Sequence, residues 1–234
     1  MFVKRMTNHE EIVFYDFVKQ AIEFFNQLGH PWFAMHGTLL GAWRHKGVIP
    51  WDDDFDILFP ENRVPELLDA IRHKGWNYTT YTHKKNIMGH AELSLINSAD
   101  RCDMYKVYNP NIIIPYMATN WPCVDVCLYK EHGDMFGFEF AKGHRFIWGY
   151  KEHFLPVKQY DFGPTKLPIP VSTETILNFL YPYWKTHPTS SHKCHRDNKS
   201  YEEKHEMKTI KELIKMGFSF YNVHIQHNFN VKSL

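Results

Sequence analysis

The stretch GVIPWDDDFDILFP, residues 47–60, constrains the fold of this chain more than any other, because it places Asp52, Asp53, Asp54 and Asp56 within five positions. Carboxylates this close together repel one another, and the apolar residues on both sides are a poor environment in which to solvate them. A chain that keeps this stretch must therefore give the four acids a specific environment.

Residues 53–59 alternate as a strand does, so that the apolar side chains face the core and Asp54 and Asp56 share the opposite face, about 6–7 Å apart. A divalent cation between them, Mg²⁺ (or Mn²⁺), relieves their repulsion, since Mg²⁺ is commonly held by one or two carboxylates and by substrate phosphates. The buried flanks disfavour the alternative of a solvated acidic turn. An EF-hand loop starting at Asp52 is excluded, because Ile57 and Arg63 stand where it requires Gly and Glu.

A further carboxylate stands in PCVDVCLY, residues 122–129, where Asp125 lies between Val124 and Val126 in a strand pattern. A buried carboxylate without a partner costs several kcal/mol, so Asp125 meets either a metal ion or a Lys or Arg side chain. When Asp125 is considered together with Asp54 and Asp56, a metal ion is the favoured partner of its carboxylate. The candidate ligands are then Asp54, Asp56 and Asp125, which are also the candidate catalytic residues.

Upstream, HGTLLGAWRHKG contains residues suited to a phosphate group. Gly37 and Gly41 predict a glycine turn that lets the backbone approach a ligand closely. Thr38 offers a hydroxyl and an amide, and Arg44 and Lys46 offer positive charge for phosphate oxygens. We expect Gly37, Thr38, Arg44 and Lys46 to bind the substrate.

The remaining pattern predicts an α+β fold, because helices and strands are mixed without regular alternation. Thr7 and Glu10 have the spacing of a capping box before a helix. We expect helices over 9–28, 64–74, 172–184 and 201–216, strands over 76–82, 90–96, 104–108 and 123–130, and a loop-rich stretch over 131–170.

These elements predict a catalytic domain over residues 1–185, a polar linker over 186–200, and a C-terminal helix and tail over 201–234. The cluster His192, Cys194 and His195 falls in the linker and is interpreted as a solvated loop rather than a metal site. The four cysteines are expected to be free, mostly buried thiols; Cys123 and Cys127 are roughly 13 Å apart on one strand, too far to bridge.

The bulk composition excludes some classes of partner. Lys and Arg (27) balance Asp and Glu (26), so the chain has no basic field for nucleic acid. No apolar run reaches the roughly 20 residues of a membrane span, and the N-terminus lacks the apolar stretch of a signal peptide. We expect a soluble chain, cytoplasmic by default, or one from the Golgi lumen if a membrane anchor is missing from the sequence.

The stretch GTLLGAWRHKGVIPWDDDFDI closely resembles the signature of the LicD/fukutin family, a branch of the nucleotidyltransferase superfamily. VDVCLY and residues 154–184 also resemble family segments, and together the similarity spans residues 10–185. The resemblance implies a nucleotidyltransferase-like mixed sheet flanked by helices. It also implies metal-dependent transfer of a phosphorylated alcohol, such as phosphocholine or ribitol phosphate, from a CDP-activated donor to a glycan hydroxyl.

By matching positions, the resemblance assigns Gly37 and Thr38 to the donor-cradling turn, Asp54 and Asp56 to the metal-binding pair, and Asp125 to the later acid, with Asp52 an additional ligand. The chain departs from the family at Tyr-Pro-Tyr-Trp, residues 181–184, where a Tyr-Gly is common, and over 84–121. The resemblance therefore does not give the acceptor.

Two other functions fit the same motifs. One is a true nucleotidyltransferase, which transfers a nucleoside monophosphate and releases pyrophosphate with the same metal chemistry. The other is a non-catalytic glycan- or protein-binding descendant, which is disfavoured because all the acids of the motif are present.

Overall fold

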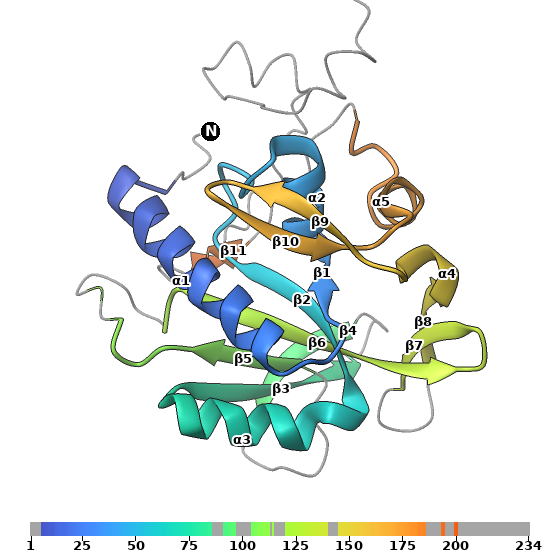
Figure 1. Ribbon diagram of the computed structural model, residues 1–234, viewed down its shortest axis with the longest axis horizontal. Helices are drawn as coiled ribbons and strands as arrows, with labels where there is room; N and C mark the ends of the chain where they lie inside the picture. Colours follow the sequence, from blue (N-terminus) through green and yellow to red (C-terminus); the bar gives the residue numbers. More distant parts are fainter. Residues whose placement is uncertain are drawn as a thin grey trace, which may run out of the picture.

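The computed structural model describes residues 6–85, 91–96, 104–112, 114, 120–139, 145–185, 193–194 and 199–200. Its centre is a mixed sheet with the strand order β1-β2-β6-β5-β3-β4, to which β7 and β8 are joined through β6 (Figure 1). Strands β2 and β6 are parallel, and the other neighbouring pairs are antiparallel. The strands are β1 (Phe33–Ala34), β2 (Phe55–Pro60), β3 (Asn77–Lys85), β4 (Ala91–Ile96), β5 (Met104–Tyr108), β6 (Cys123–His132), β7 (Met135–Glu139) and β8 (Arg145–Tyr150). The α+β prediction is confirmed.

Helix α1 (Asn8–Gln27) crosses one face of the sheet, and α3 (Val64–Lys74) lies beside it (Figure 1). The predicted capping box is present: Thr7 Oγ1 accepts the Glu10 amide, and the Glu10 carboxylate accepts the Thr7 amide. Aromatic residues at helical spacing, including the fully buried Phe14 and Phe17, form the core beneath α1. Burial of such side chains typically contributes about 1.5–3 kcal/mol each, so this face anchors β2.

Gly37 and Gly41 lie in helix α2 (His36–His45), so the predicted glycine turn is wrong. Both glycines are required by close packing and not by a turn. A Cβ at Gly41 would lie 2.6 Å from the Gly47 carbonyl oxygen, and a Cβ at Gly37 would overlap the Asp52 carboxylate. Buried leucines on the same helix outweigh the roughly 1 kcal/mol that each glycine costs a helix.

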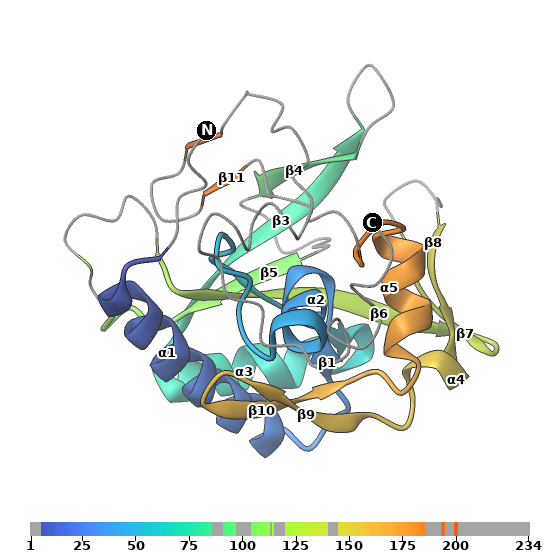
Figure 2. The same ribbon diagram turned by 90° about the horizontal axis from the view of Figure 1, so that it is seen from above.

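The stretch 131–170, predicted to be loop-rich, instead contains two hairpins. Strands β7 and β8 form the first, and β9 (Lys158–Phe162) pairs with β10 (Thr165–Ile169) in the second, where Gly163 has a φ of 57° in the connecting turn. The short helix α4 (Lys151–Phe154) joins the two hairpins, and α5 (Thr173–Leu180) follows β10. Figure 2 shows α4, α5 and the β7–β8 hairpin together at one end of the molecule. Glycine and proline break the alternation of these strands and hide it from a sequence pattern.

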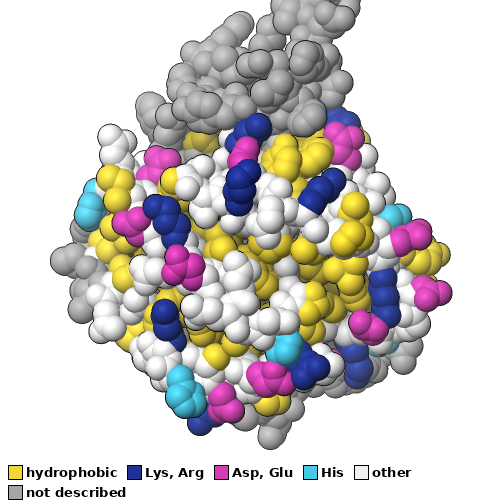
Figure 3. Space-filling model, viewed as in Figure 1, with side chains coloured by type: hydrophobic (Ala, Val, Ile, Leu, Met, Phe, Trp, Pro, Cys, Tyr) yellow, Lys and Arg dark blue, Asp and Glu magenta, His cyan; other side chains and the backbone are white. Residues whose placement is uncertain are grey.

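Only two short segments of the predicted linker are described: β11 (Lys193–Cys194) pairs with β12 (Lys199–Ser200). The predicted final helix, 201–216, and the side chains of the His192–His195 cluster lie outside the described residues. Cys123 and Cys127 are free thiols, as predicted. No helix in the described part of the chain is long and apolar enough to cross a membrane. On the face drawn in Figure 3, basic and acidic side chains are interspersed.

Candidate active site

Three neighbouring strands place the charged side chains of the site in one row across the sheet. Asp56 of β2 stands opposite Asp125 of β6, and Asp125 stands opposite Lys106 of β5. Because side chains alternate between the faces of a strand, all three point away from the face that carries Phe55 and α1. The sheet register therefore brings together residues that are 19 and 69 positions apart.

Asp54, Asp56 and Asp125 each offer a carboxylate oxygen, and these oxygens lie within 4.8 Å of one another. Asp56 and Asp125 are buried, and Asp54 is half-buried. The prediction that Asp54 and Asp56 face the same side is thereby confirmed. Oxygen ligands at this spacing suit a hard divalent cation, so the acidic cluster can hold a metal ion.

Asp52 lies beside this cluster, and its environment is set by Gly37. A Cβ at residue 37 would overlap Asp52 Oδ2 and come within 3.6 Å of Asp56 Oδ2, so glycine lets helix α2 approach the acids closely. Burial, followed by the charge of Asp54, raises the pKa of the Asp52 carboxyl well above its usual value. Burial, and then the charge of Asp54, also raise the pKa of the Asp56 carboxyl well above its usual value. Both carboxyl groups are buried among other acids, which is a condition that a bound cation relieves.

Thr38 fixes the position of Asp56 through the backbone. The Asp56 amide donates to Thr38 Oγ1 at 2.7 Å, and the Asp56 carbonyl accepts the Met35 amide at 3.1 Å. The first turn of α2 and the start of β2 are thus held together by two hydrogen bonds. The threonine hydroxyl predicted to bind substrate is engaged in positioning an acid.

Lys106 is the residue that the sequence analysis missed. Its Nζ donates to Asp125 Oδ1 and lies 3.4 Å from Cys123 Sγ. Burial alone would lower the pKa of Lys106, but the adjacent Cys123 and Asp125 outweigh burial and raise that pKa well above its usual value. Of the two partners left open for Asp125, the structure shows the lysine, and Asp125 also belongs to the acidic cluster that could hold a metal ion. The available signal was a single lysine in the predicted strand 104–108, opposite a single aspartate in 123–130.

Arg44 is completely buried. Its Nη1 donates to the Trp184 carbonyl at 2.9 Å and its Nε donates to His45 Nδ1 at 3.4 Å. Burial lowers the pKa of Arg44 to about 9, while Tyr181 and Asp52 oppose that decrease. Arg44 thus connects α2 to the segment after α5, a structural contact that the sequence analysis did not predict.

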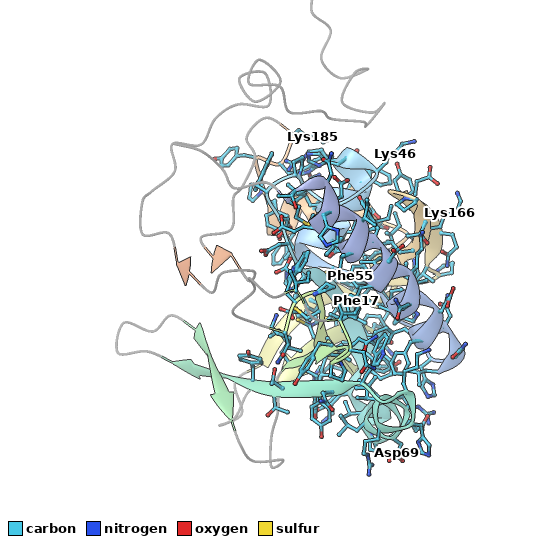
Figure 4. The ribbon with its side chains drawn as sticks, turned by 90° about the vertical axis from the view of Figure 1, so that its left-hand side faces the viewer. Phe17, Lys46, Phe55, Asp69, Lys166 and Lys185 are labelled. Atoms are coloured by element: carbon cyan, nitrogen blue, oxygen red, sulfur yellow. The ribbon has the colours of Figure 1, made fainter. Side chains whose placement is uncertain are left out.

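Lys46 is not among the residues gathered at the acids. It follows α2 in a left-handed conformation with a φ of 54°, and its Nζ lies 3.8 Å from Asp161 Oδ2 of β9. Figure 4 shows Lys46 at the outside of the molecule, away from Phe17 and Phe55 in the core. This position gives no support to its predicted contact with phosphate.

The segment Tyr181–Trp184 closes the same region. Burial raises the pKa of the Tyr181 phenol, and the charges of Asp56 and Asp52 raise it further, so the phenol shares the electrostatic environment of the acids. The Trp184 amide donates to the Tyr181 carbonyl at 2.9 Å, which makes the segment a turn held by Arg44. The place where the sequence departs from its family motif is therefore part of the wall of the site.

Asp53, the remaining acid of the motif, is buried just before β2 begins. Its backbone carbonyl accepts the Trp121 indole N–H at 2.6 Å, and its amide donates to Asp52 Oδ1 at 3.1 Å. It lies outside the three-carboxylate cluster.

Comparison with known families matches residues 29–172, more than half of the chain, to the description "LicD/FKTN/FKRP, nucleotidyltransferase domain". An uncharacterized protein of Rickettsia typhi is 23% identical over 183 residues, which cover 77% of this chain and 49% of that protein. One of Rickettsia prowazekii is 25% identical over 183 residues, covering 77% and 58%. The chain thus spans about half the length of the curated relatives it matches.

Two proteins of named activity also match. The lipopolysaccharide cholinephosphotransferase LicD of Haemophilus influenzae is 43% identical over 47 residues, which cover 20% of this chain and 16% of that protein. Among solved structures, the lincosamide antibiotic adenylyltransferase LnuA, bound to lincomycin, matches with a TM-score of 0.43 and 12% identity, over 77% of this chain and 89% of that chain.

Proposed function

The chain belongs to the LicD/FKTN/FKRP nucleotidyltransferase-domain family, and from that premise we propose that it transfers a phosphorylated alcohol from a CDP-activated donor to a glycan hydroxyl in a metal-dependent reaction. Phosphocholine and ribitol phosphate are the kinds of group proposed. The observation that carries this proposal is the cluster of Asp54, Asp56 and Asp125, whose oxygens lie within 4.8 Å of one another on the far face of a rigid sheet.

The proposed site has the parts that phosphoryl-group transfer requires. A bound Mg²⁺ or Mn²⁺ supplies positive charge to phosphate oxygens and to the leaving group. Asp54, Asp56 and Asp125 hold the ion, with Asp52 beside them as an additional ligand. Gly37 lets the start of helix α2 lie directly against Asp52 and next to Asp56, so the backbone of this turn is the part of the helix proposed to approach a donor phosphate.

The chain's own residues fix this geometry before any ligand binds. Thr38 and Met35 hold the Asp56 backbone on both sides, and Lys106 holds Asp125. Arg44 anchors the turn that carries Tyr181. Because these groups are already in position, they need not reorganise during the reaction. Such preorganisation supplies most of the electrostatic stabilisation of a transition state.

The named relative favours transfer of a substituted phosphate over transfer of a nucleotide, because it is described as a cholinephosphotransferase. A true nucleotidyltransferase would use the same acids, so the two functions differ in their products. Release of CMP from a CDP-alcohol supports the proposal, whereas release of pyrophosphate from a nucleoside triphosphate supports the alternative.

The test combines a substrate screen with one variant. CDP-choline, CDP-ribitol and the nucleoside triphosphates are screened for stabilisation of the protein in Mn²⁺; a ligand at 100 times its dissociation constant adds about 2.7 kcal/mol. Asp56→Ala is expected to fold and to lose turnover by about three orders of magnitude or more, an effect of the size seen when a charge-stabilising group is removed. Asp69→Asn, an exposed acid on α3 (Figure 4), is the matched control. Near-normal turnover in Asp56→Ala overturns the proposal, and absence of any metal-dependent nucleotide binding revives the non-catalytic alternative.

A further inference from the structure

Lys106 is a buried cation placed at the end of a row of acids. Its side chain is 14% exposed and that of Asp125 is 9% exposed, and the two form an ion pair across adjacent strands. A buried pair of this kind gives little net stability over apolar residues of the same size. The stability of the fold therefore does not account for this ion pair. Its position in the row that carries the acidic cluster indicates a role in the site itself.

The position of the ammonium group is the relevant geometry. Two-metal sites for phosphoryl chemistry hold their ions about 3.5–4 Å apart, with a carboxylate shared between them. In this row Asp125 is the central carboxylate: one of its oxygens lies within 4.8 Å of those of Asp54 and Asp56, and its Oδ1 accepts Lys106 Nζ. Since β6 lies between β2 and β5, Lys106 reaches the central acid from the strand on the side away from Asp56.

We propose, resting on the proposed function, that Lys106 is a positioning residue that takes the place of a second divalent cation, so that the site binds one metal ion. The ammonium group neutralises Asp125 permanently and keeps its carboxylate directed along the row. Asp54, Asp56 and Asp125 remain as ligands for a single ion. The neighbouring thiol of Cys123, 3.4 Å from Lys106 Nζ, completes the pocket of the ammonium group without adding a carboxylate.

The test counts metal ions on the full chain, with Mn²⁺ as the probe. Isothermal titration and the electron paramagnetic resonance signal of free Mn²⁺ are each used to measure the number of ions per chain. The wild type is expected to bind one ion. Lys106→Met, which keeps the length of the side chain and removes its charge, is expected to bind two, because Asp125 is then free to bridge them.

Two controls separate the charge of Lys106 from its bulk and from general charge loss. Lys106→Arg keeps a cation at this position and is expected to bind one ion. Lys166→Met removes a lysine that pairs with Asp161 in an exposed hairpin, 2.7 Å away, and is also expected to bind one.

Removing Lys106 leaves a buried acid without its partner, so the Lys106→Met protein is prepared and measured in Mn²⁺. The double variant Lys106→Met/Asp125→Asn removes both charges and preserves the fold without metal. It is expected to bind one ion, since the bridging carboxylate is absent.

The outcomes distinguish this inference from the function on which it rests. Two ions on the wild type, one ion on Lys106→Met, or two ions on the double variant overturns the role of Lys106 and leaves the proposed function standing. A wild type that binds no Mn²⁺ overturns both.

Discussion

Replacing Asp56 with asparagine should stabilise the metal-free protein while it abolishes activity. The substitution keeps the shape of the side chain and removes one charge from a cluster whose oxygens lie within 4.8 Å of one another. At an effective dielectric constant of about 20, two carboxylates 4.8 Å apart repel by about 3.5 kcal/mol. Lys106 offsets the charge of Asp125, so Asp54 supplies most of the repulsion that Asp56→Asn removes.

Part of that repulsion is already relieved, because burial and Asp54 raise the pKa of Asp56 and favour its protonated form. We therefore expect a gain of about 2 kcal/mol in the free energy of unfolding at pH 8 in EDTA. At about 2–4 °C per kcal/mol for a chain of this size, the melting temperature rises by about 4–8 °C. The gain should shrink or reverse in saturating Mg²⁺, which binds the wild type and stabilises its folded state.

Asp53→Asn is the matched control, because it removes the same charge from a buried acid one residue outside the cluster. We expect it to lower stability modestly, to retain metal-dependent stabilisation and to retain most of the activity, while Asp54→Asn and Asp56→Asn lose metal-dependent turnover. Calorimetry with and without Mg²⁺ and a CMP-release assay measure both effects. The reasoning is refuted if Asp56→Asn melts below the wild type in EDTA, or if Asp53→Asn is as inactive as Asp54→Asn with its fold intact.

Three further substitutions test the surroundings of the acids. Gly37→Ala places a methyl group against Asp52, so it should lower the free energy of unfolding by about 1–3 kcal/mol and weaken Mn²⁺ binding. An unchanged Mn²⁺ affinity in isothermal titration would contradict the close approach of Gly37 and Asp52. Arg44→Lys loses the guanidinium group that donates to the Trp184 carbonyl, so calorimetry should show a free energy of unfolding lower by about 2 kcal/mol. A higher KM for the donor at unchanged stability would instead indicate direct contact with phosphate. Burial, and then Arg44, hold the pKa of His45 well below 6.5. Below pH 6.5 the unfolded chain therefore binds a proton at His45 that the native state does not bind. The free energy of unfolding of the wild type should then fall relative to that of His45→Gln, by up to about 1.4 kcal/mol per pH unit. Parallel denaturation curves at pH 5.5 and 7.5 measure this difference.

The parts of the fold that the sequence predicted well are those with a strong local period. The helix at 9–28 and the helix at 64–74 agree with α1 and α3 to within a residue at each end, because helical spacing of apolar residues and a capping residue act within a few positions of each other. The strand that carries Asp56 was predicted for the same reason, since alternation alone decides which side chains share a face, although β2 begins at Phe55 and not at the predicted residue 53.

The parts that failed depend on distant contacts. Gly37 looks like a turn residue by its neighbours, yet it lies in helix α2, and the close approach of Asp52 accounts for glycine at this position. The predicted contact of Arg44 with substrate stays a prediction, but its hydrogen bond to a carbonyl 140 positions away could not be foreseen. Neither fact is encoded within the span of a local motif, so composition and spacing favoured the commoner role of each residue.

Lys106 shows most directly what a sequence motif leaves out. The motif names the acids, which are close in sequence or follow a strand pattern, but the electrostatics of the site depend on which side chains the register places next to them. A shift of one residue between β5 and β6 would move Lys106 to the opposite face and leave Asp125 beside an apolar neighbour. Since β5 and β6 are antiparallel and joined by a long connection, no local rule sets that register; the packing of Val107 and Val124 on the core face does. The charge of the proposed metal site is therefore decided by apolar residues on the other side of the sheet.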